Sequence, residues 1–196
     1  MYDDEFELTF DLSDKDEASR APEPEQEPVQ EAEPEPAAET EPPVEAVPEP
    51  AVPAANGRCV LISGGDRGIG AAAARAFWQA GYRVAVLYHT HAEAAAALEK
   101  ALPGLLAVQC DVASRASCEV AFHTVEQAVG HVDVLVSNAG IAQQKLFTDI
   151  TPEEWQHMLD VNLSGAFHLC QLALPGMIRR KAGRILTVSS MWGQTG

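Results

Sequence analysis

Short apolar runs alternate with longer stretches in which apolar residues recur at helical spacing. Five runs have the length of strands and cover residues 59–62, 84–88, 105–108, 132–136 and 185–188. Helical spacing predicts helices over residues 69–80, 92–102, 117–129 and 151–174. Glycine or proline follows these helices, at Gly81, Pro103, Gly130 and Pro175, where each is expected to end.

The predicted strands are apolar throughout, without alternating polar residues. Strands that are buried on both faces of a parallel sheet have this composition. Regular alternation of strands with helices builds such a sheet through right-handed crossovers. We therefore predict an α/β fold over residues 56–196, a doubly wound parallel sheet of the Rossmann type. Its ligand crevice is expected at the carboxyl ends of the strands.

The first 55 residues have a different composition. They hold 18 of the 29 acidic residues and ten of the 13 prolines, with only Lys15 and Arg20 as basic residues, so they carry the whole formal net charge of −16. Such a segment cannot bury a core, and we predict a disordered acidic extension over residues 1–55. It serves either as a solubilising linker or as a tail that recruits a partner. Its charge indicates nothing about the ligand of the folded part.

Cysteine and histidine spacing gives little support for a metal site. Four cysteines lie apart without a Cys-x-x-Cys pattern, and we expect reduced thiols in a cytoplasmic protein. The six histidines lack ligand spacing, so no metal is predicted; a site at His89 and His91, two residues apart in a loop, is the weaker alternative. The chain does not start like a signal peptide, and no apolar run approaches the roughly 18 residues of a membrane span. We expect neither a membrane nor a nucleic acid as partner.

A glycine-rich segment joins the first predicted strand to the first predicted helix, with the spacing G-x-x-x-G-x-G. Glycine allows backbone angles that other residues disfavour, and the helix N-terminus directs N–H groups and a positive dipole end at a bound pyrophosphate. A glycine turn that binds nothing is the alternative. The predicted dinucleotide-binding residues of this segment are Ser63, Gly64, Asp66, Arg67, Gly68, Ile69 and Gly70.

Three later segments match motifs of one enzyme family and occur in the same order as in that family. They are Ser137-Asn138-Ala139-Gly140, Asp160-Val161-Asn162-Leu163-Ser164-Gly165 and Val188-Ser189-Ser190. Together with the glycine turn they make the chain resemble the short-chain dehydrogenase/reductase family over about residues 58 to 196. The resemblance implies that Asp111, Val112, Asn138, Ala139 and Gly140 bind the cofactor.

The same resemblance implies two catalytic residues. Ser190, with Ser189 as the second candidate, matches the serine that donates a hydrogen bond to the substrate carbonyl. Asn162 matches the asparagine that holds a water in the proton relay. Plainer alternatives remain open for these residues. Asp111 could cap a helix over a core Val112, Asn162 could be a packing residue, and Ser190 could belong to a turn at the end of a strand.

The end of the second strand indicates which nicotinamide cofactor is bound. NAD sites carry a carboxylate there, but this chain has Tyr88-His89-Thr90-His91, without an acid that would repel a 2′-phosphate. Arg67 lies in the glycine turn and could pair with that phosphate. We therefore predict NADP(H) rather than NAD(H).

Reduction of a ketone by hydride transfer needs a proton donor. The resemblance implies a Tyr-x-x-x-Lys pair about a dozen residues beyond Ser190, but the chain ends at Gly196. We therefore expect a C-terminally truncated domain that is inactive as given. The family forms homo-oligomers through the long helix after Thr151, an assembly expected of the complete protein but not necessarily of this chain.

Two segments beside the expected crevice indicate the substrate. Residues 140–147 and 190–194 are similar to those of 3-oxoacyl-carrier-protein reductases and of reductases that act on a 5-aminopentanone group on elongation factor P. The resemblance thus implies a 3-oxoacyl-like or protein-attached aminopentanone ketone. The alternative is a non-catalytic fragment that binds a cofactor and recruits a partner through its acidic tail.

Overall fold

The computed structural model describes residues 54–190, so the predicted disordered extension lies outside the described residues except for its last two positions. Five parallel strands form one sheet in the order β3-β2-β1-β4-β5. They are β1 (Cys59–Ser63), β2 (Arg83–Tyr88), β3 (Leu106–Gln109), β4 (Val134–Ser137) and β5 (Arg184–Thr187). The prediction of a doubly wound parallel sheet is confirmed.

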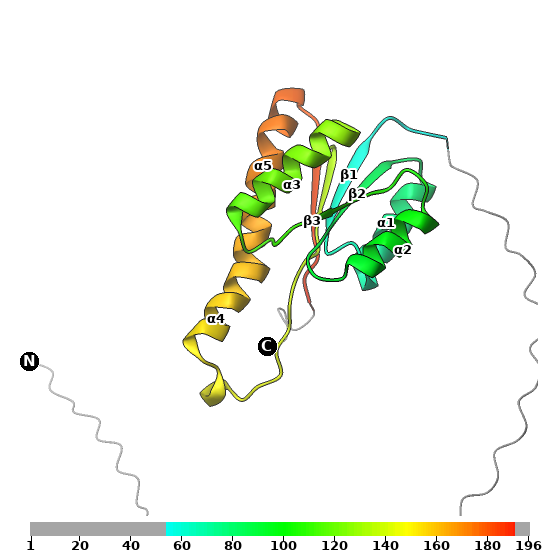
Figure 1. Ribbon diagram of the computed structural model, residues 1–196. Helices are drawn as coiled ribbons and strands as arrows, with labels where there is room; N and C mark the ends of the chain where they lie inside the picture. Colours follow the sequence, from blue (N-terminus) through cyan, green and yellow to red (C-terminus); the bar gives the residue numbers. More distant parts are fainter. Residues whose placement is uncertain (1–53, 191–196) are drawn as a thin grey trace, which may run out of the picture. The chain divides into compact units, whose positions relative to one another are not determined.

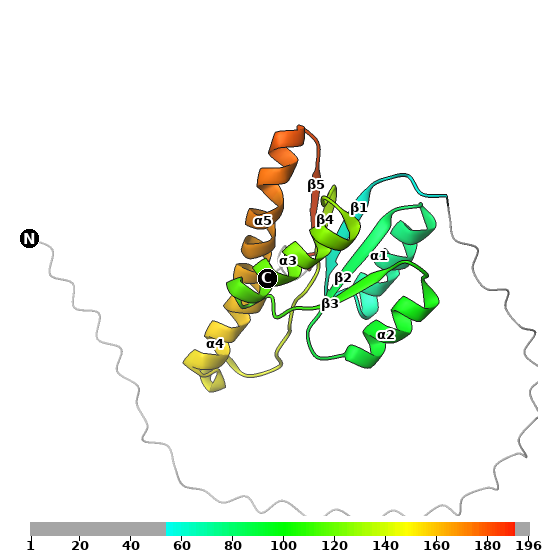
Figure 2. The same ribbon diagram turned by 45° about the horizontal axis from the view of Figure 1, so that its top comes forward.

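Helices cover both faces of this sheet (Figures 1 and 2). One face carries α1 (Gly68–Gln79) and α2 (Ala92–Ala101), and the other carries α3 (Arg115–Val129) and α5 (Gly165–Arg180). Three short elements connect β4 to α5: η1 (Phe147–Asp149), α4 (Pro152–Leu159) and the π-helical turn η2 (Asp160–Ser164).

Two hydrophobic clusters explain why the central strands are apolar throughout. Val60 and Ile62 of β1 pack with Trp78 of α1, whereas Leu61 of the same strand packs with Phe122 of α3 on the opposite face. All five residues of β1 are buried. The expectation of burial on both faces therefore holds at the centre of the sheet.

The same expectation is wrong at the edges. All four residues of β5 are exposed, and three of the four residues of β3 are partly buried. Both strands have a neighbouring strand on one side only among residues 54–190. Apolar composition alone did not distinguish these edge strands from central ones.

The predicted helix over residues 151–174 is correct at its start and wrong at its end. The Thr151 hydroxyl accepts from the Glu154 N–H at 3.2 Å, and the Glu154 carboxylate accepts from the Thr151 N–H at 2.9 Å, which forms the expected capping box. The helical path, however, continues through Pro175 to Arg180. Buried residues at i+4 spacing, Leu169, Ala173 and Met177, keep this face packed on the core, and that packing outweighs the missing proline N–H.

The order of the strands reverses between β1 and β4, which lie side by side at the centre of the sheet. The two strands run side by side to their carboxyl ends, and the helices that follow them, α1 after β1 and α5 after β4, lie on opposite faces of the sheet. In doubly wound sheets such a reversal is where ligands bind. Both the glycine turn and the segment beginning at Asn138 start at this point.

Candidate functional site

The turn between β1 and α1 presents backbone amides at the carboxyl edge of the sheet. Gly64 and Gly68 have φ angles of 61° and 52°, in the left-handed region that favours glycine. A Cβ atom at Gly68 would meet nothing within 4 Å, so the space beside it is open. Helix α1 has no side-chain cap and no acidic residue in its first turn. This end of the helix is therefore suited to an anion.

Ser63 ties the turn to the loop after β4. Its hydroxyl oxygen accepts from the N–H groups of Asn138 and Ala139, each at 3.0 Å. In return, Asn138 Nδ2 donates to the carbonyl oxygens of Ser63 and Gly64, each at 2.9 Å. Gly70 packs so closely that a Cβ atom would collide with the Gly64 carbonyl oxygen. The glycine turn and the start of the next loop are thus held as one unit.

A cavity of about 440 Å³ opens beside this unit. It is lined by most of the residues predicted to bind the cofactor: Gly64, Asp66, Arg67, Gly68, Ile69, Asp111, Val112, Asn138, Ala139 and Gly140. The other two, Ser63 and Gly70, are buried and shape the turn from within. The fold therefore brings the predicted residues together, while what they bind stays a prediction.

Several lining residues were not among those predicted. Cys110 and Ile141 directly adjoin predicted residues, so adjacency to a motif was a usable signal for both. His157 and Val161 also line the cavity and come from α4 and η2. They are four residues apart and share one side of the helical path, but nothing in the sequence places that side over the cavity.

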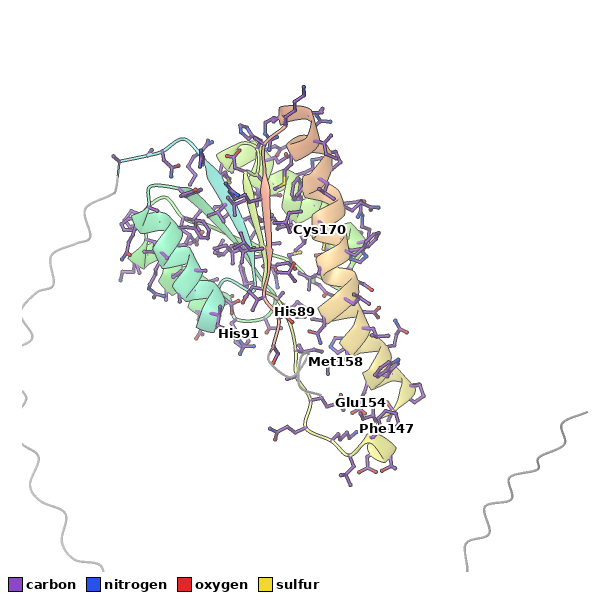
Figure 3. The ribbon with its side chains drawn as sticks, turned by 180° about the vertical axis from the view of Figure 1, so that it is seen from behind. His89, His91, Phe147, Glu154, Met158 and Cys170 are labelled. Atoms are coloured by element: carbon purple, nitrogen blue, oxygen red, sulfur yellow. The ribbon has the colours of Figure 1, made fainter. Side chains whose placement is uncertain are left out.

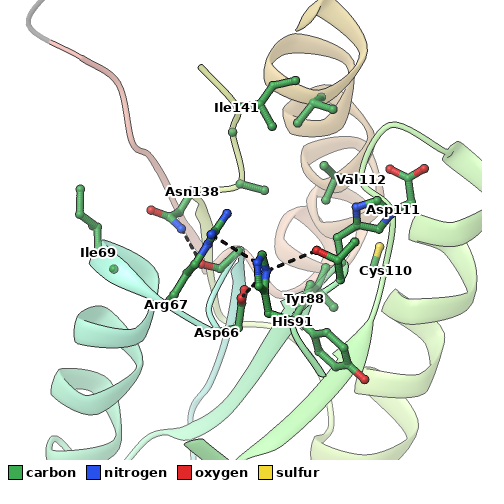
Figure 4. A pocket seen from close by; sticks show the side chains of 18 of the residues that line it. Asp66, Arg67, Ile69, Tyr88, His91, Cys110, Asp111, Val112, Asn138 and Ile141 are labelled. Carbon is green, nitrogen blue, oxygen red and sulfur yellow. Dashed lines mark hydrogen bonds and ion pairs between the residues drawn. The ribbon is translucent and has the colours of Figure 1, made fainter. Parts of the chain in front are cut away.

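Three ionisable side chains meet where the turn approaches the loop after β2 (Figure 4). Asp66 Oδ2 lies 3.5 Å from His91 Nδ1, and Arg67 Nη1 lies 3.4 Å from His91 Nε2. The Asp66 side chain is only 6% exposed, and its Oδ2 atom makes no hydrogen bond within residues 54–190. Asp66 and His91 are therefore in contact at ion-pair distance without a hydrogen bond between them.

This cluster corrects one expectation from the sequence. No carboxylate was expected beside the end of the second strand, yet Asp66 reaches His91 from the glycine turn. No acid follows β2 directly in the sequence, but the fold brings the Asp66 carboxylate to this place from the glycine turn. His89 and His91 are labelled in Figure 3, which views the molecule from behind.

The segment after β3 contributes Asp111 and Val112. Asp111 Oδ1 accepts from the Ala113 N–H at 3.0 Å, whereas α3 is capped by Ser114. The alternative that Asp111 caps this helix is therefore wrong. Val112 is 8% exposed and packs against Gly165, where a Cβ atom would come within 2.9 Å of Val112 Cγ2. Val112 thus combines a core position with a place in the cavity wall.

Asn162 lies in the π-helical turn and holds the loop after β4. Its Oδ1 atom accepts from the Ile141 N–H at 2.8 Å, and its Nδ2 atom donates to the Ile141 carbonyl at 3.0 Å. The same Nδ2 atom lies 2.8 Å from the sulfur of Met158, which Figure 3 labels on α4. Asn162 is itself exposed, and what its side chain does in this structure is to hold the backbone of Ile141. Its predicted part in a proton relay stays a prediction.

Ser190 follows β5 at the carboxyl edge of the sheet. Strand β5 pairs with β4, with Thr187 opposite Ser137, and the Val188 N–H donates to the Ser137 carbonyl at 2.9 Å. Ser190 and Asn138 therefore follow neighbouring strands at the same edge. Ser190 is exposed and is not among the residues that line the cavity. Its catalytic role stays a prediction.

Two kinds of feature are missing from residues 54–190. No three His, Cys, Asp or Glu side chains in this part of the chain gather as the ligands of a metal ion would. None of its helices has both the length and the apolar character needed to cross a bilayer.

The sequence matches the family model for short chain dehydrogenase over residues 58–196. It is 40% identical to acetoacetyl-CoA reductase of Shinella zoogloeoides over 139 residues, which cover 71% of this chain and 57% of that protein. It is also 40% identical to the 3-oxoacyl-[acyl-carrier-protein] reductase MabA of Mycobacterium avium over 144 residues, 72% of this chain and 53% of that protein. The chain thus spans about half the length of the curated relatives it matches.

A solved structure shares this architecture. The crystal structure of gox2181 superimposes with a TM-score of 0.65 and is 32% identical in sequence. The match covers 70% of this chain and 55% of the other.

Proposed function

Because the chain belongs to the short-chain dehydrogenase family, we propose that it supplies the cofactor-binding part of an NADP(H)-dependent oxidoreductase that reduces a ketone to an alcohol. The observation that supports this proposal most strongly is the cavity between the glycine turn and the loop after β4, two segments that Asn138 joins. The bound dinucleotide would supply the hydride, and the protein would position it.

The residues of the turn fit a dinucleotide. The uncapped N-terminus of α1 would hold the pyrophosphate through backbone N–H groups, and the open space beside Gly68 leaves room for it. Asp111 and Val112 would hold the adenine, and the loop after Asn138 would adjoin the nicotinamide end. The close packing of Gly70 on Gly64 supports this assignment, because it fixes the turn before any ligand arrives.

Arg67 supports NADP(H) over NAD(H). It is exposed, and its guanidinium reaches the loop after β2, where doubly wound sheets receive the ribose. The nearby Asp66 carboxylate opposes a second negative charge, but it is largely buried and its Oδ2 atom lies against the His91 imidazole. A 2′-phosphate would therefore meet the exposed Arg67 guanidinium rather than this acid.

Ser190 and Asn162 would take part in the chemistry. We assign Ser190 the hydrogen bond to the substrate carbonyl and Asn162 the support of a proton relay. The 196 residues contain no Tyr-x-x-x-Lys sequence. We therefore expect this chain to bind the cofactor without oxidising it.

The names of the relatives favour a 3-oxoacyl thioester as the substrate class. Both relatives described above are reductases of such ketones, one on coenzyme A and one on an acyl-carrier protein. The aminopentanone alternative has no counterpart among these names.

Calorimetric titration with NADPH and NADH tests the proposal. We expect NADPH to bind more tightly, and Arg67→Ala to weaken NADPH binding by about tenfold to a hundredfold while leaving NADH nearly unchanged, because one charge-assisted contact is lost. Arg75→Ala is the matched control, since Arg75 is an exposed arginine within α1, whereas Arg67 lies in the turn before it. Equal affinities for the two cofactors would refute the NADP assignment, and no binding of either would refute the proposed function.

A further inference from the structure

Two buried thiols meet in the wall of the cavity. Cys110 follows β3 directly and lines the cavity, and Cys118 lies near the start of α3. Their sulfur atoms are 4.0 Å apart, and the residues are 3% and 0% exposed. The sequence separates them by seven residues without any recognised motif, so only the fold brings them together. Figure 4 shows the Cys110 sulfur beside Asp111.

The surroundings of the two sulfurs differ. Hydrogen bonding from Cys118 lowers the pKa of the Cys110 thiol, with help from the Ser117 hydroxyl at 3.8 Å, although burial opposes this effect. The same contact and burial raise the pKa of the Cys118 thiol. The Cys118 sulfur also lies 3.5 Å from the carbonyl oxygen of Val112. Cys110 is thus the sulfur that ionises more easily, and it is the one on the cavity wall.

We propose that Cys110 and Cys118 form a reversible disulfide when the protein meets a peroxide. Disulfide sulfurs lie about 2 Å apart, so the two must approach by about 2 Å, a shift within reach of side-chain rotation. Cys59 is buried in β1 and Cys170 lies on α5, and neither has a sulfur partner in the part of the chain that the structure describes. The pair is therefore a specific site.

The chemistry balances with hydrogen peroxide as the oxidant. The Cys110 thiolate attacks one peroxide oxygen, the O–O bond breaks, and the hydroxide released takes up a proton to leave Cys110 as a sulfenic acid. The Cys118 sulfur then attacks the Cys110 sulfur, the S–O bond breaks, and the departing hydroxide takes the Cys118 proton. Two thiols lose two electrons and two protons, and the peroxide becomes two molecules of water.

The location of the pair gives the disulfide a consequence. The covalent link closes a loop that contains Asp111 and Val112, and both residues line the cavity. Formation of the disulfide would therefore make the shape of this cavity wall depend on the redox state of the protein.

Peptide mass analysis of the oxidised protein tests the inference. The reduced 196-residue chain is treated with one equivalent of hydrogen peroxide, its remaining thiols are alkylated, and it is digested with trypsin without reductant. Cleavage after Arg115 puts Cys110 in the peptide 101–115 and Cys118 in the peptide 116–145, with Cys59 and Cys170 on two others. We expect 101–115 linked to 116–145, with the loss of two hydrogens, and a fall from four free thiols to two. Dithiothreitol reverses both changes.

Variants identify the order of the steps. Cys170→Ala keeps the link and serves as the matched control. Cys118→Ala removes the link and leaves Cys110 as a sulfenic acid that dimedone traps. Retention of all four thiols, or earlier oxidation of Cys59 or Cys170, overturns the inference. Because the peptides report the disulfide itself, the result is independent of whether the protein binds NADPH.

Discussion

Ser63→Ala is the substitution for which the structure predicts the clearest loss of stability. The Ser63 hydroxyl accepts two backbone N–H groups, those of Asn138 and Ala139, each at 3.0 Å, and the residue is 1% exposed. Alanine fills nearly the same space but accepts neither bond. A hydrogen bond contributes about 1 kcal/mol net, so the free energy of unfolding should fall by about 2 kcal/mol.

Urea unfolding followed by far-ultraviolet circular dichroism measures this loss. With an m value of about 2 kcal/mol per molar urea, the midpoint should fall by about 1 M. Ser137→Ala is the matched control, because Ser137 ends the neighbouring strand and is 6% exposed, yet its hydroxyl makes no hydrogen bond among residues 54–190. That control should change stability by less than about 0.5 kcal/mol. Equal midpoints for the two variants would refute the conclusion that the Ser63 hydroxyl stabilises the fold by accepting from Asn138 and Ala139.

Three further substitutions test other parts of the account. Gly70→Ala places a methyl group against the Gly64 carbonyl, so the free energy of unfolding in urea should fall by about 1–3 kcal/mol. Calorimetry should show that most of the NADPH affinity is lost as well, and unchanged values in both assays would contradict the close packing. Asn162→Ala removes both bonds to Ile141, so hydrogen exchange should speed up in the loop after β4 and not in β1, and an unaltered loop would count against this role. Burial raises the pKa of the Cys59 thiol from 9.0 to about 11, so the thiol ionises more readily in the unfolded chain than in the folded one. The free energy of unfolding should therefore be unaffected below pH 9 and should fall by about 3 kcal/mol as the pH rises through 11. Urea unfolding between pH 8 and 11 should show this decline, and it should be smaller in Cys59→Ala. If stability falls equally with pH in both proteins, ionisation of Cys59 is not its cause.

The sequence predicted the parts of the fold that local pattern determines. Central strands such as β1 are apolar because helices cover both faces, and the glycine turn is visible because its backbone angles require glycine at Gly64 and Gly68. The capping box at Thr151 and Glu154 is equally local, since its two hydrogen bonds join residues three apart.

What the sequence missed depends on contacts between distant residues. Helix α5 passes through Pro175 because Ala173 and Met177 on either side of it are buried, and no local preference records that packing. Asp66 and His91 are 25 positions apart, and only the parallel pairing of β1 with β2 sets them side by side. His157 enters the cavity wall from α4, an element whose direction the sequence did not fix.

Hydrogen exchange with and without NADPH tests the central claim most directly, because it locates the ligand as well as detecting it. If the cavity holds a nicotinamide dinucleotide, NADPH should slow exchange in residues 64–70 and in the loops after β3 and β4, while the far end of α5 stays unchanged. Saturating NADPH that leaves residues 64–70 exchanging at their original rate would contradict it.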